Sequence, residues 1–467
     1  MSNGEHEVNS RSEKTSSGKW SHWAKRLEVD RAVIYSLCLR GWQLLAGAVS
    51  AILIARWFSP DVQGYYYTFS SLLTLQAIFE LGCAQVVTNV ASHEWSHLSL
   101  DDAGRIQGDR NAKSRLVSLG RFVFKLYGGV ALLFVLLVGL GGAWFLGQQP
   151  AGDVLWRTPW FCLVAVSGLL LWTLPFNALL EGCHQVATVS RFRFFQAVAT
   201  NFAVWTSLVL ELNLWVAVIA TTTRLVCELV LLLVRYRRFM GVFLFPPESE
   251  RINWREELWP LQWRLGLQSA CGFLSTSLYA PVMFYYHSKA VAGRMGMTWM
   301  MMFAVQAAAL SWIQTRIPRF GVLIARREYD TLDRLFRRLT WISMAVVSLG
   351  GVLLCLTVWL LNVFEFSLAG RVLQPDVTAV FMFAIVVLQL SHCQAAYIRA
   401  HKRDPLLVVN MASYLLTGLG VWWFGSQYGP WGAGLVYLCV ILFVTTPFHS
   451  WLWWQCRKDW HSEDTLT

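Results

Sequence analysis

The chain has 467 residues, of which 55% are hydrophobic and only 14% are charged, whereas an average soluble domain carries about 25% charged residues. A soluble protein of this size could not cover so much apolar surface with so few charges, so soluble and disordered classes of protein are excluded. The composition predicts an integral membrane protein.

The apolar residues gather in long blocks that predict twelve transmembrane spans. Several blocks contain no Asp, Glu, Lys or Arg over roughly the 20 residues that a span needs. Block 405–456 is long enough for two spans, and the turn at 425–430 divides it. Runs this long are helical, because the strands of membrane barrels have about 10 residues. The expected fold is therefore all-α, with spans at 33–56, 65–91, 126–152, 158–180, 194–211, 213–234, 265–288, 295–315, 339–364, 377–398 and the two halves of 405–456.

The basic residues predict the orientation of these spans. With the N-terminus placed in the cytoplasm, 31 of the 39 Lys and Arg residues fall on the inner side, 5 on the outer side and 3 within spans. Such an excess is typical of cytoplasmic loops. We therefore expect a multi-pass protein with both termini in the cytoplasm. The topology also accounts for the net charge of +11, so no nucleic-acid partner is expected.

Twelve spans divide into two sets of six. We expect an N-terminal lobe of residues 31–234 and a C-terminal lobe of residues 259–455, joined by a basic cytoplasmic linker at 235–258. Cytoplasmic tails would cover residues 1–30, which we expect to be disordered, and residues 456–467. Because six is even, the lobes would be related by an axis along the membrane normal, as parallel repeats are. A substrate path would then lie between them.

The loops favour a transporter over an enzyme. The longest outer loops, 147–158 and 365–376, have roughly 12 residues each, which is too few to carry an external active site. The inner loops contain no phosphate-binding glycine loop, no His-Glu-x-x-His motif and no paired carboxylates. No cofactor or metal is therefore predicted.

Short motifs in a fixed order resemble those of a known family. The segment Ala55–Tyr65, which reads ARWFSPDVQGY, is similar to the Ala-Arg-x-Leu-Gly-Pro-x-x-x-Gly-x-Tyr turn of bacterial polysaccharide exporters of the O-antigen flippase type. Phe58 and Ser59 stand where that turn has Leu-Gly. Further resemblances lie at Glu80–Gly82, Leu180–Gly182, Arg316–Pro318, Arg326–Arg338, Ile398–Ala400 and Tyr428–Ala433.

The resemblance implies the fold of the multidrug/oligosaccharidyl-lipid/polysaccharide exporter superfamily, with twelve transmembrane helices in two parallel six-helix lobes. The implied activity is movement of a polyprenyl-pyrophosphate-linked oligosaccharide from the inner to the outer leaflet of the bacterial inner membrane, by alternating access. The implied partners are this lipid-linked oligosaccharide and membrane lipids, and contact with other polysaccharide-assembly membrane proteins is compatible with the resemblance. Many relatives have an acidic residue in the seventh span, whereas Leu274–Tyr286 has none.

Charged side chains inside a bilayer cost about 2.5–3.5 kcal/mol on insertion scales, so they normally face a cavity or a partner. Arg40 and Arg264 lie at similar depth in the first and seventh spans, which the duplication makes equivalent. Two guanidiniums on facing lobes could clamp a pyrophosphate, because arginine binds phosphate in a bidentate manner. Gln43 and Gln268 lie one turn further in and would assist. The alternative is that both arginines snorkel to the inner headgroups.

Three more charged residues lie within spans. Glu80 is too deep to snorkel and is the candidate for binding a coupling proton or cation; the alternative is a structural partner of Arg or Gln on a neighbouring helix. Arg224 and Glu228 are four residues apart in the sixth span and can pair on one helix face. Such a pair either neutralises itself or lines the cavity and contacts sugar hydroxyls.

Pro281 lies within the seventh span, where it removes a backbone donor and can kink the helix. It is the candidate hinge, and a static kink is the alternative. Most tryptophans fall near predicted membrane interfaces, as in an aromatic belt. Trp172, Trp205 and Trp299 are nearer span interiors and are candidates for stacking on a sugar.

Three other functions compete with the flippase. A cation-coupled multidrug exporter of the same superfamily would favour an acidic cavity, but three arginines and two glutamates lie within the predicted spans. A membrane polymerase or ligase would need a sizeable outer loop. A non-transporting membrane scaffold would have an apolar, sealed centre between the lobes.

Overall fold

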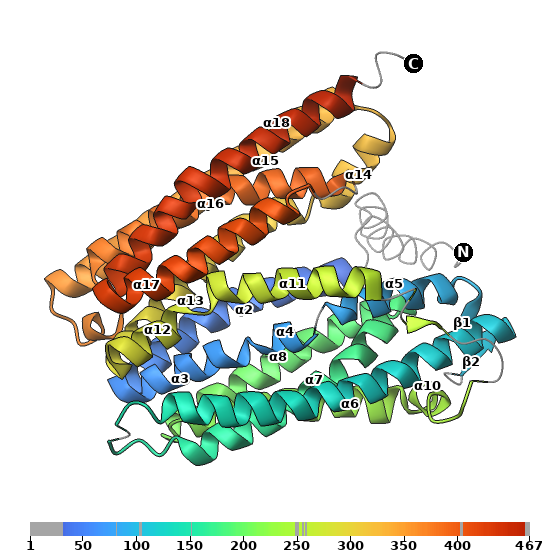
Figure 1. Ribbon diagram of the computed structural model, residues 1–467, viewed down its shortest axis with the longest axis horizontal. Coiled ribbons are helices and arrows are strands. Elements are labelled where there is room, and N and C mark those ends of the chain that lie inside the picture. Colours follow the sequence, from blue (N-terminus) through green and yellow to red (C-terminus); the bar gives the residue numbers. More distant parts are fainter. Residues whose placement is uncertain are drawn as a thin grey trace, which may run out of the picture.

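The computed structural model describes residues 31–80, 82–101, 105–150, 152–247, 252–254, 256, 259–401 and 405–462. These residues form long helices and one small hairpin of strands (Figure 1). The tail predicted at residues 1–30 lies outside the described residues.

The first half of the chain forms the N-terminal helix group. Its elements are α2 (Arg31–Trp57), α3 (Pro60–Leu73), α4 (Gln76–Glu80), α5 (Cys83–Trp95), β1 (Leu98–Leu100), β2 (Ile106–Gly108), α6 (Arg110–Leu146), α7 (Arg157–Gly182), α8 (Val186–Val209), α9 (Trp215–Val230), a π-helical turn (Leu231–Arg235) and α10 (Arg237–Val242).

The second half forms the C-terminal helix group. Its elements are α11 (Trp259–Thr276), α12 (Tyr279–Tyr286), α13 (Lys289–Gln314), α14 (Ile317–Ala325), α15 (Tyr329–Val363), a 3₁₀ turn (Ala369–Arg371), α16 (Pro375–Ala400), α17 (Leu407–Val440), a π-helical turn (Ile441–Thr445) and α18 (Thr446–Ser462).

The helical membrane-protein fold predicted from composition is confirmed. Among the described residues, eight helices are long and apolar enough to cross a membrane, or nine if a bent pair counts as one span. Helices also occupy the other predicted positions. One is α8, which carries Arg191 and Arg193, and another is the interrupted pair α11 and α12. The count of twelve spans stays a prediction.

The helix α17 contains a reversal at the turn predicted to divide residues 405–456. Gly429 has a φ of 62°, a backbone conformation that side chains with a Cβ rarely adopt, and Pro430 follows it. A Cβ placed on Gly432 would lie 2.3 Å from the carbonyl oxygen of Phe424, and one on Gly420 would lie 2.3 Å from a methyl of Val436. These paired approaches show two antiparallel helices packed against each other across the turn.

Two of the predicted spans are interrupted helices. The second span consists of α3, α4 and α5, and the axes on either side of Gly82, which has a φ of 64°, differ by 43°. The seventh span breaks between α11 and α12 at Ser277 and Leu278. Pro281 lies four residues after Ser277, so the carbonyl that its missing N–H would have bonded belongs to the break. This position is compatible with the predicted hinge, which stays a prediction.

The two helix groups meet at one end of the molecule. Toward the other end α15, α16 and α18 diverge from the N-terminal helix group (Figure 1), whereas α11 stays packed against α4 and α5. At the closed end α3 packs tightly on α13, because Gly64, Gly293 and Gly296 let the two backbones approach closely. The buried side chain of Gln63 donates to the carbonyl oxygens of Gly293 at 2.9 Å and Arg371 at 3.0 Å. By the predicted topology, this closed end faces the outside.

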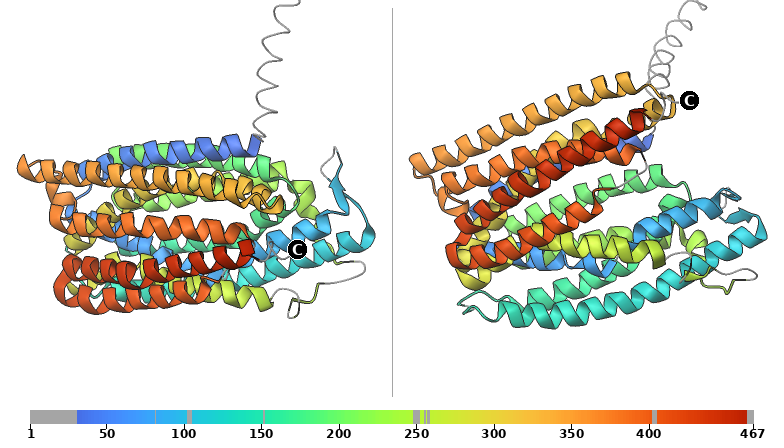
Figure 2. Two further views of the ribbon diagram at one scale, coloured as in Figure 1. Left: turned by 90° about the horizontal axis from the view of Figure 1, so that it is seen from above. Right: turned by 45° about the horizontal axis from the view of Figure 1, so that its top comes forward.

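The opposite end carries structure where the sequence predicted only an inner loop. The strands β1 and β2 form an antiparallel hairpin within residues 92–125, and Figure 2 shows it projecting at the end where α18 terminates. The helix α6 begins at Arg110 instead of near residue 126, because Asp109 caps its first turn through a 2.8 Å bond to the N–H of Ala112. With 37 residues it is about 55 Å long, well beyond the roughly 30 Å of a hydrocarbon core.

Candidate substrate cavity

The N-terminal helix group encloses a cavity of about 630 Å³, which we call the charged cavity. Its wall comes from α3, α4, α7, α8 and α9. The ionised or amide side chains in this wall are Gln76, Glu80, Asn177, Arg193, Gln196, Arg224 and Glu228. Two guanidiniums and two carboxyl groups therefore line one cavity.

The carboxylate of Glu228 is held by two amides from neighbouring helices. Asn177 of α7 donates a hydrogen bond to Oε1, and Gln196 of α8 donates to Oε2 at 3.3 Å. Gln196 also donates to the backbone oxygen of Arg224 at 3.0 Å. Glu228 is buried, whereas Arg224 is exposed. Within the described residues, no ion pair or hydrogen bond joins the side chains of Arg224 and Glu228, so the amides take the place of the predicted i, i+4 partner.

Arg193 gives this cavity a second guanidinium. Its Nη2 lies 2.5 Å from Oε1 of Glu181, at the end of α7. Arg193 is 48% exposed and Glu181 is 26% exposed, so the pair is hydrated and a ligand can compete for the guanidinium.

A second cavity of about 580 Å³, which we call the aromatic cavity, lies between the two helix groups. Tyr66 and Tyr67 of α3 face Tyr279, Trp299 and Phe303 of the C-terminal group across it. The ring centroids of Tyr279 and Trp299 are 4.2 Å apart, and those of Trp299 and Phe303 are 5.0 Å apart. Clustered aromatic rings beside serine and threonine hydroxyls provide both the apolar faces and the hydrogen bonds that a sugar needs.

The two cavities adjoin, because Tyr66, Ser70 and Thr74 line both. The breaks in the interrupted helices contribute residues to the walls of both cavities. Thr74 follows α3, Glu80 ends α4, and Ser277 lies in the break before α12. Irregular backbone at membrane depth is tolerated where it is buried in protein or lines a wet cavity. Discontinuous helices of this kind form the binding sites of many transporters.

The predicted site residues fall into two sets. Glu80, Arg224 and Glu228 line the charged cavity together. Arg40 and Gln43 are exposed on α2, Gln268 is half-buried on α11, and none of these three lines either cavity.

The side chain of Arg264 lies outside the described residues. The two-arginine clamp therefore stays a prediction.

The three candidate tryptophans also separate. Trp299 lines the aromatic cavity and donates to the carbonyl oxygen of Thr276 at 3.1 Å. Trp172 donates to the carbonyl oxygen of Phe124, and Trp205 donates to Ser50 on α2, so both hold helices together.

Sequence reasoning did not select Asn177 or Arg193 for the site. Arg193 belonged to a predicted loop, but α8 begins at Val186 and includes it. In the part of the chain that the structure describes, no three His, Cys, Asp or Glu residues could together hold a metal ion.

The fold is similar to several solved membrane transporters. A structure of the lipid II flippase MurJ in an inward closed conformation matches with a TM-score of 0.60 and 11% identity, over 89% of this chain and 86% of that one. An inward-facing multidrug resistance MATE family transporter of the MOP superfamily matches with a TM-score of 0.59 and 12% identity, over 93% of this chain and 99% of that one. A MATE protein in complex with MaL6 matches with a TM-score of 0.56 and 14% identity, over 92% of this chain and 96% of that one.

No family model and no curated protein matches the sequence. The structural likeness nevertheless confirms the fold predicted from the short motifs, which is that of MOP superfamily transporters. The matched structures are transporters, not enzymes. Because they include both a lipid flippase and multidrug transporters, the cargo of this chain has to be argued from its own residues.

Proposed function

We propose that this chain is a flippase that moves a polyprenyl-pyrophosphate-linked oligosaccharide from the inner to the outer leaflet by alternating access. The lobes would be residues 31–234 and 259–455. The observation that carries the proposal is the pair of adjoining cavities, of which the charged cavity lies within the N-terminal helix group and the aromatic cavity lies between the two groups. The charged cavity offers Arg193 and Arg224 to phosphate, and the aromatic cavity offers aromatic rings to sugars.

The geometry gives the transport cycle a direction. Closure at the predicted outer end, with divergence of α15, α16 and α18 from the N-terminal helix group at the predicted inner end, is the arrangement that admits a substrate from the cytoplasmic leaflet. Parting of α3 from α13 would then expose the aromatic cavity to the outside. The polar lining favours transport over a scaffold, because a scaffold has no need for charged groups in its centre.

A multidrug exporter is the second candidate, and the two carboxylates of the charged cavity favour it. Glu80 and Glu228 could bind a cationic drug or a coupling cation. The amide donors from Asn177 and Gln196 weigh against this role for Glu228, because they already occupy its two oxygens.

Proteoliposomes distinguish these functions. Leaflet accessibility of a polyprenyl-pyrophosphate oligosaccharide is followed for wild type and for Arg224→Ala, with Arg157→Ala as a matched control, since Arg157 is exposed and lines neither cavity. We expect translocation by wild type and by the control. For Arg224→Ala we expect the rate of translocation to fall about tenfold or more, because this is the effect of losing a hydrogen bond to a charged group. The variants Arg40→Ala and Arg264→Ala test the clamp in the same assay.

A second arm loads the same vesicles with a cationic dye. Expulsion of the dye that depends on Glu228, without translocation of the lipid, would replace the flippase with the exporter. A well-folded wild type that moves neither compound would overturn both.

A further inference from the structure

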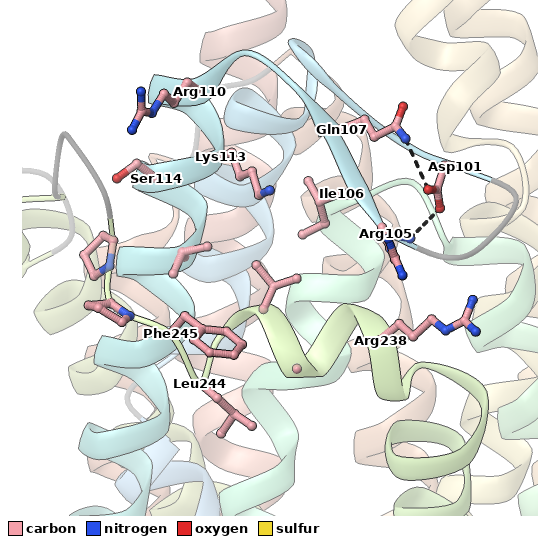
Figure 3. A pocket seen from close by; sticks show the side chains of 15 residues that line it. Asp101, Arg105, Ile106, Gln107, Arg110, Lys113, Ser114, Arg238, Leu244 and Phe245 are labelled. Atoms are coloured by element: carbon pink, nitrogen blue, oxygen red, sulfur yellow. Dashed lines mark hydrogen bonds between the residues drawn. The ribbon is translucent and has the colours of Figure 1, made fainter.

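A third cavity lies away from the substrate path, at the predicted cytoplasmic end of the N-terminal helix group. It has a volume of about 590 Å³ and shares no lining residue with the charged or aromatic cavity. The β-hairpin forms one wall, the first turns of α6 form another, and α10 with residues 244–247 forms the floor (Figure 3). We call it the basic cavity.

The side chains of the basic cavity carry a strong positive charge. Arg105, Arg110, Lys113 and Arg238 line it, against the single carboxylate of Asp101. That carboxylate is engaged in the hairpin, where it accepts from the N–H of Arg105 at 2.7 Å and from the amide of Gln107 at 3.1 Å. Figure 3 shows Lys113 reaching between α6 and the hairpin, and Arg105 pointing from the hairpin toward α10. Among the described residues that line this space, basic side chains thus exceed carboxylates by three.

The floor of this cavity lies where the membrane surface is expected. The sixth span is predicted to end at residue 234, and α10 begins at Arg237. Leu244 and Phe245 follow α10 and are 76% and 70% exposed, although both are apolar. Arg121 fixes this segment against α6 by donating to the carbonyl oxygen of Leu244 at 2.6 Å. The basic side chains of the walls match the phosphate headgroup of a lipid, and the apolar side chains of Leu244 and Phe245 match its acyl chains.

We propose that the basic cavity binds the phosphate headgroup of an anionic membrane phospholipid on the cytoplasmic side. The volume suits a small headgroup, and Arg and Lys donors suit phosphate oxygens. A soluble phosphate compound would satisfy the basic residues equally well. It would leave Leu244 and Phe245 without an apolar neighbour, so a lipid fits the whole site better. The inference does not depend on what the substrate cavities transport.

Native mass spectrometry of the full chain in detergent tests the proposal, with phosphatidylglycerol and phosphatidylcholine added at equal concentration. We expect wild type to retain one phosphatidylglycerol in preference to phosphatidylcholine. Each Lys or Arg near an anionic lipid contributes about fivefold in affinity. The variant Arg105→Gln/Lys113→Gln should therefore bind phosphatidylglycerol about 25-fold more weakly.

A matched control and a steric variant sharpen the result. Arg337→Gln/Arg338→Gln removes the same charge from exposed residues of α15 outside the cavity, and it should leave the preference unchanged. Gly241→Leu fills the cavity and leaves all of its charged residues in place. The new side chain can be accommodated, because a Cβ at Gly241 meets no atom within 4 Å. We expect it to lose the lipid while its melting temperature matches that of wild type.

Three outcomes would overturn the proposal. One is a wild type without preference for phosphatidylglycerol, and another is equal lipid binding by wild type and both cavity variants. The third is calorimetric binding of inorganic pyrophosphate that is as tight as that of the lipid in wild type and is lost in Arg105→Gln/Lys113→Gln, which would assign the basic cavity to a soluble anion.

Discussion

Lys289, the first residue of α13, forms an ion pair with Asp61 in the first turn of α3, with 3.4 Å between Nζ and Oδ2. The pair joins the two helix groups at their closed end. Lys289 is only 11% exposed, whereas Asp61 is 49% exposed. The ammonium also lies 5.7 Å from the ring centroid of Tyr65. One cation is thus held between an acid and a ring of the opposite helix group.

Loss of this ion pair should favour opening of the closed end. A pair with one hydrated partner contributes up to about 1 kcal/mol, so Asp61→Asn should shift the equilibrium toward the open form by up to about fivefold. Spin labels on Gln148→Cys and Ser367→Cys, in the two predicted outer loops, report the separation by pulsed electron resonance. The exchange Asp61→Lys/Lys289→Asp should restore the short distance. An unchanged distance distribution in Asp61→Asn would remove the pair from the closing mechanism.

The glycine contact should matter more than the ion pair. A Cβ on Gly64 would lie 2.1 Å from the carbonyl oxygen of Lys289, far inside the shortest tolerated contact. Gly64→Ala should therefore separate α3 from α13 and lengthen the distance between the same two labels. Gly47→Ala, on α2, is the control, because a Cβ there meets nothing within 4 Å. Equal distances in both variants would show that the helices can shift without opening the closed end.

Much of the fold could be predicted because hydrophobic spans are a strong signal. Apolar blocks located the helices, and Gly429 with Pro430 marked a reversal because these residues terminate helices through their own backbone chemistry. The break after Thr74 has no such marker. It depends on how α4 packs against α6 and α11, which lie far away in the sequence.

The site was predictable only in part, for a similar reason. The cost of burying charge selected Glu80, Arg224 and Glu228, and these three do share a cavity. The partner of Glu228 could not be read from spacing, because Asn177 approaches it from a different helix. Arg193 was assigned to a loop because the apolar run begins only after Arg191 and Arg193, whereas α8 already begins at Val186.

Trp299 should contribute to recognition of the sugar, if the aromatic cavity holds the oligosaccharide. Its ring is part of the cavity wall, and its centroid lies 4.2 Å from that of Tyr279. Aromatic contacts contribute about 0.5–1.5 kcal/mol, so Trp299→Ala should raise the apparent KM of translocation by roughly three- to tenfold. Trp172→Ala is the matched control, since Trp172 lines neither cavity. An effect of equal size in both variants would assign Trp299 to packing, and rescue by Trp299→Phe would support stacking.

The direction of transport depends on the orientation predicted from charge. In a background without the ten native cysteines, Gln148→Cys should react with a membrane-impermeant maleimide added to intact cells. Arg337→Cys should react only after the cells are permeabilised. Both positions are exposed, so a difference in labelling reports the side of the membrane and not burial. The reverse pattern would place the contact between Asp61 and Lys289 on the cytoplasmic side, and this conformation would then admit substrate from outside. Uptake would replace export as the direction to test, and the basic cavity would face the outer leaflet.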